Sequence, residues 1–499
     1  MKTNKELFLE YKEKLNRLFY VISILSYDSN TTCPKNDLEY AFEIENYFSI
    51  EADKILKSEK FYQILKSLND NPSDLNEIEK LEIKYELEQL NKERMVPQRY
   101  VKKSYPLFSK AHLDWLKGRE NQEYKDFVKD LDALIKYYKG YAKYVDEKSN
   151  SYDVLLDVME DGMNIQKYDE LFDLIKKELH PLYKKCIKAP KKYNEKIKTL
   201  RFDIKEQERL TEEIAQIMGF KKEFGVIRTT IHPFSNTINM NDSRITTSYH
   251  EDLLFSNVYS IMHEIGHSLY ELGNKKELNN TFLFGGTSMG IHESQSRFYE
   301  NYLGRSRSFI EFLYPILIKH FKELEEFSVD DIYYYVNDVT KEPLRIEADE
   351  LSYPFHIIIR YEIEKKLFSG EIKGKDVPKY FNQLFKEYFG YIPSSLTLGA
   401  FQDIHWTSDF GYFPTYALGS AFGAQFYNKM KSEIDIDKDL RKGDFSNITS
   451  WLGSHIHQFG KSKKNFEIIK YATNEEFNPR YYIDYLKNKF GRIYDINEN

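Results

Sequence analysis

The sequence contains few cysteines, prolines and glycines, and it has no long apolar run. Its 499 residues include 2 cysteines, 14 prolines and 22 glycines. Cys33 and Cys186 are far apart in the chain, so the disulfide framework of a small secreted protein is excluded and free thiols are expected. No segment is apolar for long enough to cross a bilayer, and the first residues do not resemble a signal peptide. We therefore expect a cytoplasmic protein without a membrane partner.

An excess of positive charge is also lacking. The chain has 72 basic and 79 acidic residues, which gives a net charge of -7. This charge argues against nucleic acid as the main partner. Hydrophobic residues make up 41% of the chain, enough for a large core or several domains.

Helical periodicity dominates the pattern that is present. Residues 77–95 and 123–145, for example, repeat apolar side chains every three or four positions, with charges between them. Residues 224–252 break this rhythm with β-branched residues, short alternation and turn residues, which predicts strands and a hairpin. The sequence therefore predicts a mainly α-helical protein with one small β-sheet.

The segment "HEIGH" contains two histidines on a hydrophobic stretch that directly follows the predicted strands. His263 and His267 are four residues apart, so they share one face of a helix and can bind the same ion. Glu264 lies about 100° around that helix, within reach of a molecule bound there. This H-E-x-x-H spacing is typical of two metal ligands and a general base. The alternative is a structural helix whose histidines are four apart without function.

A catalytic zinc usually takes a third protein ligand. A histidine six residues after His267 is excluded, because that position is Gly273. The next predicted helix, "IHESQSRFYENYLGRS", offers Glu293, which we expect in its first turn, where the helix dipole favours a carboxylate. His292 is the competing candidate, and an exposed structural glutamate is the alternative interpretation of Glu293.

These residues belong to a series of short motifs that follow one another along the chain. They are "HPF" (232–234), "DSRIT" (242–246), "HEIGH", "HES" (292–294), "LRIEAD" (344–349) and "GAFQDIHW" (399–406), which is followed by "FGYFPTYALG". In this combination the sequence resembles the carboxypeptidase Taq family of metallocarboxypeptidases. The resemblance extends along the whole chain, and no metal or catalytic position departs from the family pattern.

The resemblance and the spacing together suggest a role for each candidate residue. His263, His267 and Glu293 would bind one divalent metal per subunit, with Zn²⁺ expected and Co²⁺ possible, and Glu264 would act as general base. His405, Tyr412, Tyr416 and His232 are the candidates for stabilising the oxyanion. The alternative for each of these four is packing or support of a neighbouring side chain.

An exopeptidase also needs a group that recognises the substrate's terminal carboxylate. An arginine suits this role because its planar fork can bind both oxygens. Arg345 is the first choice, on an expected helix where Glu347 and Asp349 could hold it, and Arg244 is the second. The alternative is that Arg345 is a salt-bridged structural residue.

The family resemblance implies an elongated helical metallopeptidase with a deep active-site groove, a small β-sheet beside the zinc helix, and a homodimeric assembly. We expect a single unit, 1–499, in which residues 1–225 form a helical part that covers the groove, 226–420 the catalytic core and 421–499 a helical C-terminal part. The expected substrates are peptides with a free C-terminal carboxylate. A metallo-oligopeptidase on the same scaffold and a non-catalytic peptide-binding protein are the two rival interpretations.

Overall fold

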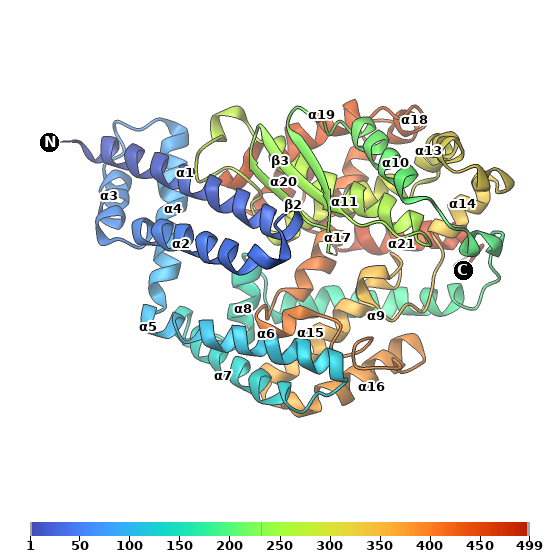
Figure 1. Cartoon of the computed structure of the whole chain (residues 1–499), viewed down its shortest axis with the longest axis horizontal. Coiled ribbons are helices and arrows are strands. Elements are labelled where there is room, and N and C mark those ends of the chain that lie inside the picture. The colour runs from blue at the N-terminus through green and yellow to red at the C-terminus, as the bar shows by residue number, and fades with distance from the viewer. Residues whose placement is uncertain (1, 231, 497–499) are drawn as a thin grey trace.

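The fold is almost entirely helical, as predicted. The computed structural model describes residues 2–230 and 232–496, and the two termini lie at opposite ends of the molecule (Figure 1). The first ten helices are α1 (Asn4–Thr31), α2 (Leu38–Leu56), α3 (Glu59–Asp70), α4 (Glu77–Met95), α5 (Gln98–Val101), α6 (Ser104–Asn121), α7 (Phe127–Val145), α8 (Ser151–Met159), α9 (Ile165–Cys186) and α10 (Ile204–Ile217).

The remaining helices follow a short β region. They are α11 (Leu254–Leu272), α12 (Met289–Arg297), α13 (Arg307–His320), α14 (Val329–Val336), α15 (Tyr353–Ser369), α16 (Val377–Phe389), α17 (Phe413–Lys431), α18 (Ile436–Leu440), α19 (Ser446–His455), α20 (Asn465–Thr473) and α21 (Arg480–Ile493). None of the helices in the described part of the chain combines the length and apolar character that a bilayer crossing requires.

The β-sheet lies where the sequence predicts it. Its strands are β1 (Gly225–Thr229), β2 (Ser235–Asn239) and β3 (Asp242–Thr247), in the spatial order β1-β3-β2. Strands β2 and β3 are antiparallel and form the predicted hairpin, whereas β1 adds to β3 in parallel. The sheet packs on α11, where the hydroxyl groups of Ser243 and Ser268 are hydrogen-bonded. The sheet thus supports the helix that carries "HEIGH".

Buried side chains form two hydrophobic clusters. The smaller one joins helices α1 to α4 and includes Phe8, Phe61 and Ile83, and the larger one extends from α6 to the C-terminal helices. Phe282, from the segment between α11 and α12, packs against the smaller cluster. The division into parts that meet at residues 225 and 420 stays a prediction.

Glycines let three helices approach one another closely around the candidate site. A Cβ atom on Gly266 of α11 would lie 2.8 Å from the carbonyl oxygen of Gln295 in α12. A Cβ atom on Gly419 of α17 would lie 2.7 Å from the Cβ atom of Glu293. Side chains larger than hydrogen at these positions would push the helices apart, so the glycines set the position of α12 between α11 and α17.

Helix α12 begins earlier than the sequence suggests. Ser288 is its N-cap and accepts a hydrogen bond from the Ile291 backbone N–H at 3.2 Å. Glu293 therefore lies in the second turn and not in the first. The helix then continues as a π-helix, Phe298–Gly304. Arg345 also differs from expectation, because it lies in a three-residue 3₁₀ turn, Arg345–Glu347.

Candidate metal centre

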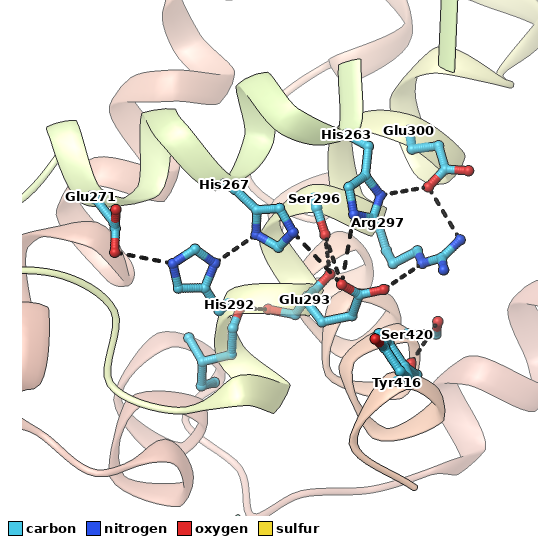
Figure 2. A network of polar contacts seen from close by, with 12 residues as sticks. His263, His267, Glu271, His292, Glu293, Ser296, Arg297, Glu300, Tyr416 and Ser420 are labelled. Carbon is cyan, nitrogen blue, oxygen red and sulfur yellow. Dashed lines mark hydrogen bonds and ion pairs between the residues drawn. The ribbon is translucent and has the colours of Figure 1, made fainter. Parts of the chain in front are cut away.

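The structure brings His263, His267 and Glu293 together. One nitrogen or oxygen atom from each lies within 4.8 Å of the others. The Oε2 atom of Glu293 is 3.7 Å from the Nε2 atom of His263 and 3.7 Å from that of His267. The two histidines point from α11 toward the carboxylate on α12 (Figure 2). Such a set of two imidazoles and one carboxylate, converging on a single point, is suited to a divalent ion such as zinc.

His263 is oriented by a carboxylate on its far side. Its Nδ1 atom lies 2.8 Å from the Oε2 atom of Glu300, in the π-helix that follows α12. Nδ1 therefore donates to Glu300, and Nε2 is the nitrogen that faces Glu293 and is left for a metal (Figure 2). A carboxylate behind a ligating histidine fixes the ring and raises its basicity as a metal ligand.

His267 is oriented by a second histidine. Its Nδ1 atom is 2.6 Å from the Nδ1 atom of His292, and the Nε2 atom of His292 is 3.1 Å from the Oε1 atom of Glu271. Burial, together with His292 and His263, lowers the pKa of His267 well below its ordinary value, so the ring is neutral. If His267 donates from Nδ1 and His292 donates to Glu271, the Nε2 atom of His267 remains free for a metal. Both nitrogens of His292 are used in this chain of contacts.

Glu293 is held through both carboxylate oxygens. The Nε atom of Arg297 donates to Oε1 at 2.8 Å, and the hydroxyl group of Ser296 donates to Oε2 at 3.3 Å. Arg297 also donates to Glu300 at 3.2 Å, so one guanidinium links the carboxylate beside His263 to the candidate ligand. The donor set therefore fits a divalent metal: two imidazoles and one carboxylate, each held by a neighbouring group.

Glu264 follows His263 on α11 and is not part of this trio. Its side chain is buried, with 7% of the residue exposed. Burial raises the pKa of Glu264 to about 7, and the nearby His263 opposes that shift. A carboxylate with a pKa near neutrality can both accept and return a proton at physiological pH.

The aromatic candidates form a second group beside the trio. The Nε2 atom of His405 and the hydroxyl oxygen of Tyr416 are 3.2 Å apart, and the ring of Tyr412 stacks on His405 with centroids 5.3 Å apart. Burial and the nearby Arg345 lower the pKa of His405 to about 4, so its imidazole is neutral. Tyr416 lies on α17 beside Glu293 (Figure 2).

Arg345 contacts this aromatic group and is mostly buried. Its guanidinium carbon lies 4.8 Å from the centre of the Tyr416 ring. Its Nε atom donates to Asp403 at 2.9 Å, and its Nη1 atom is 3.4 Å from the hydroxyl oxygen of Tyr353. The carboxylate that holds Arg345 is therefore Asp403, and neither Glu347 nor Asp349 as the sequence suggested.

The two remaining candidates lie in the β region. Arg244 on β3 donates from Nε and Nη2 to the two carboxylate oxygens of Asp242, each at 2.9 Å, and its guanidinium lies over the Tyr27 ring. His232 is exposed, and within residues 2–230 and 232–496 no hydrogen bond or ion pair joins it to another side chain. The structure thus places Arg345 close to the candidate oxyanion donors. Arg244 is instead paired with Asp242, and His232 is exposed.

Sequence reasoning missed the residues that hold the ligands. Arg297 and Glu300 follow Glu293 at four and seven residues, a helical spacing that was available as a signal. Sequence reasoning also missed Arg360, which stands in the largely apolar stretch "FHIIIRY" (355–361). A charged residue in such a stretch indicates a buried charge, but nothing in the sequence identifies its partner.

The chain is similar to known proteins along nearly its whole length. Residues 7–490 match the family described as Carboxypeptidase Taq (M32) metallopeptidase. Carboxypeptidase 1 of Bacillus subtilis (strain 168) is 35% identical over 495 residues, with 99% of each chain covered. The M32 carboxypeptidase from Deinococcus radiodurans R1 has a TM-score of 0.96 at 26% identity, covering 99% of this chain and 100% of that one.

A third similarity is to a solved structure of the Pyrococcus furiosus carboxypeptidase. It has a TM-score of 0.93 at 29% identity and covers 98% of this chain and 99% of that one. This chain belongs to the carboxypeptidase Taq (M32) family of metallopeptidases, which are metal-dependent peptide hydrolases. The family resemblance predicted from the motifs is thereby confirmed, and so is a fold that is mainly helical.

Proposed function

We propose that the protein is a metal-dependent carboxypeptidase that releases single amino acids from the C-terminus of peptides. The observation that carries this proposal is the convergence of His263, His267 and Glu293, whose ligand atoms lie within 4.8 Å of one another. One divalent ion per subunit would bind there, Zn²⁺ in preference to Co²⁺, because nitrogen and carboxylate ligands suit zinc. When bound, the ion polarises the scissile carbonyl and makes water a stronger acid.

Glu264 is the proposed general base. It would accept a proton from the attacking water and then donate that proton to the leaving amine. Two features support this role: the residue adjoins His263 on α11, and burial raises its pKa to about 7. A carboxylate with an ordinary pKa would be a weaker base and would accept the proton of the water less readily.

Tyr416 is the proposed donor to the oxyanion, with His405 and Tyr412 in support. If the neutral His405 donates from Nε2 to the hydroxyl oxygen of Tyr416, 3.2 Å away, the hydroxyl hydrogen of Tyr416 is free to point at substrate. Removing a single donor of this kind commonly costs roughly 3 kcal/mol of transition-state stabilisation. His232 is the less favoured candidate, because it is exposed.

Arg345 is the proposed anchor for the terminal carboxylate of the substrate. Its Nε atom is engaged by Asp403, but its Nη1 atom has only a long contact of 3.4 Å with Tyr353. Donors at the end of the guanidinium are thus available for a bidentate pair with a carboxylate. Arg244 is the second candidate, and it is less favoured because its Nε and Nη2 atoms already form a bidentate pair with Asp242.

One experiment tests the whole proposal. Metal-loaded protein is incubated with a mixed-sequence peptide and with the same peptide amidated at its C-terminus, and products are followed by mass spectrometry. Stepwise loss of single residues from the free-acid peptide alone is the expected result. Internal cleavage of both peptides would instead support the oligopeptidase, and the absence of any turnover would support a peptide-binding protein.

We also propose a cytoplasmic, homodimeric protein that acts as one structural unit over residues 1–499. The location is supported by Cys33 and Cys186, which are both free thiols. The homodimer and the deep groove rest on the family resemblance. Light scattering coupled to size-exclusion chromatography tests the dimer, and a mass equal to one chain of 59.6 kDa would contradict it.

A further inference from the structure

The proposed anchor, Arg345, shares the carboxylate of Asp403 with a second buried arginine, Arg360. Asp403 accepts from the Nε atom of Arg345 at its Oδ1 atom, at 2.9 Å. Its Oδ2 atom accepts from the Nε atom of Arg360 at 2.7 Å and forms an ion pair with the Nη2 atom of Arg360, 2.6 Å away. Arg360 is 0% exposed, Asp403 is 4% exposed and Arg345 is 8% exposed. Each oxygen of Asp403 is therefore used by a different guanidinium, and only Arg345 reaches the surface.

The charges in this cluster do not cancel. Both guanidiniums stay protonated in a protein, so two positive charges face one negative charge. The neighbouring His356 is fully buried, both of its ring nitrogens lack a hydrogen-bond partner, and its pKa lies well below the ordinary value because of burial and the two arginines. No second carboxylate in the described part of the chain contacts Arg345 or Arg360. The cluster thus holds a buried excess of one positive charge.

An uncompensated buried charge is unfavourable unless an anion arrives to pair with it. Arg360 cannot meet a substrate, since none of its surface is exposed. Its effect is exerted through Asp403: because Arg360 occupies Oδ2, Asp403 neutralises Arg345 only in part. A second carboxylate beside Arg345 would give two positive and two negative charges, whereas an amide would leave the excess charge in place.

We infer that Arg360 is a positioning residue that keeps the charge of Arg345 available for the terminal carboxylate of the substrate. This inference rests on the proposed function, in which Arg345 is the anchor. It assigns the preference for a free acid over an amide to three residues and not to Arg345 alone. The ligand class is any peptide or acylated amino acid that ends in a carboxylate.

The test measures binding to metal-free protein, so that catalysis plays no part. Isothermal titration calorimetry compares an N-acylated dipeptide with its C-terminal amide. Arg360→Met removes the charge and keeps most of the length, and Arg360→Lys is the matched control that keeps the charge. We expect Arg360→Met to lose roughly tenfold or more of the preference for the acid, which corresponds to about 1.4 kcal/mol, because the excess positive charge that favours a carboxylate is removed. Arg360→Lys should retain most of it.

A second readout separates this role from a structural one. In the metal-loaded enzyme, Arg360→Met should raise KM for free-acid peptides and change kcat little, whereas damage to the fold would lower kcat and Tm as well. If the single variant misfolds, Arg360→Met combined with Asp403→Asn leaves Arg345 with its full charge, and the preference for the acid should return.

Several outcomes would overturn the inference. An Arg360→Met variant that folds and keeps the wild-type preference for the acid is one, and a double variant that restores no preference is another. If Arg345→Lys loses the preference while Arg360→Met keeps it, only this inference is wrong. If the wild-type protein binds acid and amide equally, the anchor in the proposed function is wrong as well.

Discussion

At the scale of single residues, the first prediction concerns Glu264, the proposed general base. Glu264→Gln removes the base but keeps the size of the side chain and leaves His263, His267 and Glu293 in place. We expect full metal content and a loss of kcat of roughly 100-fold or more, since general-base catalysis contributes about that much. Steady-state kinetics together with elemental analysis provide the measurement. A variant with near wild-type kcat would show that another group takes the proton.

Glu300, which is hydrogen-bonded to His263, should affect the metal affinity without contacting the ion itself. Glu300→Gln weakens the hydrogen bond to the Nδ1 atom of His263, which is 2.8 Å long. Substitutions of this kind typically cost about 10–100-fold in metal affinity, and competition with a chromophoric chelator measures the loss. Glu311→Gln is a matched control, because that carboxylate is also held by two basic side chains, Arg307 and Arg441, but not by a histidine. Equal affinities in the two variants would contradict the role of Glu300.

Local spacing explains which of these residues were predictable. His263, Glu264 and His267 lie within one helix, so the period of the helix alone brings them together. Contacts between distant segments carry no such signal. Asp403 meets Arg345 and Arg360 across 58 and 43 residues, and the chain between them determines that meeting only through its whole fold. The sequence therefore offered Arg345 as a candidate but assigned it the wrong partners.

Contacts between helices position the site, and Gly266 lies at a close contact between α11 and α12. In Gly266→Ala, the new Cβ atom would lie 2.8 Å from backbone atoms of Gln295 and Ser296, which cannot rotate away. We expect a lower Tm, with about 1–3 kcal/mol lost through overpacking, and weaker metal binding because α12 carries Glu293. Gly453→Ala on α19 is the control, since its Cβ atom would meet nothing within 4 Å. Similar Tm values for the two variants would contradict close helix packing as the cause.

A buried glutamate connects α15 to the segment that carries His405 and Tyr412. The Oε2 atom of Glu364 accepts from the Tyr152 hydroxyl and from the Gly411 backbone N–H, both at 2.8 Å, while Oε1 has no partner. Burial raises the pKa of Glu364 from 4.5 to about 8. The folded state thus binds this proton more tightly than the unfolded state does. The stabilisation that comes from binding this proton is complete below pH 4.5 and is lost as the pH rises through about 8.

Glu364→Gln should therefore stabilise the protein only at high pH. Glutamine resembles the protonated carboxyl group, because its oxygen can accept both hydrogen bonds and it never ionises. At pH 5 we expect similar Tm values for the wild type and the variant, and at pH 9 a higher Tm for the variant. Differential scanning calorimetry across this range makes the comparison. Two parallel curves of Tm against pH would mean that Glu364 does not ionise as the contacts indicate.

Sequence periodicity predicted the type of each helix or strand better than the residues at which it begins and ends. The hairpin of β2 and β3 and the helical character of α11 follow from local patterns, whereas the start of α12 does not. Ser288 caps that helix partly because its hydroxyl group donates to Glu160, 2.7 Å away and 128 residues earlier. The carboxylate also accepts from the Gly290 backbone N–H at 2.7 Å. A contact of this range fixed the first turn, so Glu293 lies one turn further along the helix than the motif alone suggests.

At the scale of the whole molecule, the segment before α12 links the two hydrophobic clusters. Glu82 on α4 is fully buried and accepts from Lys12 at 2.9 Å and from the Phe282 backbone N–H at 3.0 Å. The Phe282 ring packs against Phe8 and Phe61, with centroids 6.4 Å apart in each pair. The segment between the two helices that carry the candidate ligands thus contacts α1, α3 and α4, although helices α1 to α4 contribute no candidate ligand.

Metal binding should consequently stabilise the entire chain. An ion on His263, His267 and Glu293 would join α11 to α12, and a ligand that binds only the folded state stabilises it by about 4 kcal/mol at 1,000 times its Kd. We expect Tm to rise when Zn²⁺ is added to metal-free protein and to fall again with a chelator. Glu264→Gln should show the same shift, because it keeps all three ligands, whereas Glu293→Ala should show little. A Zn²⁺-dependent shift of wild-type size in Glu293→Ala would place the ion elsewhere.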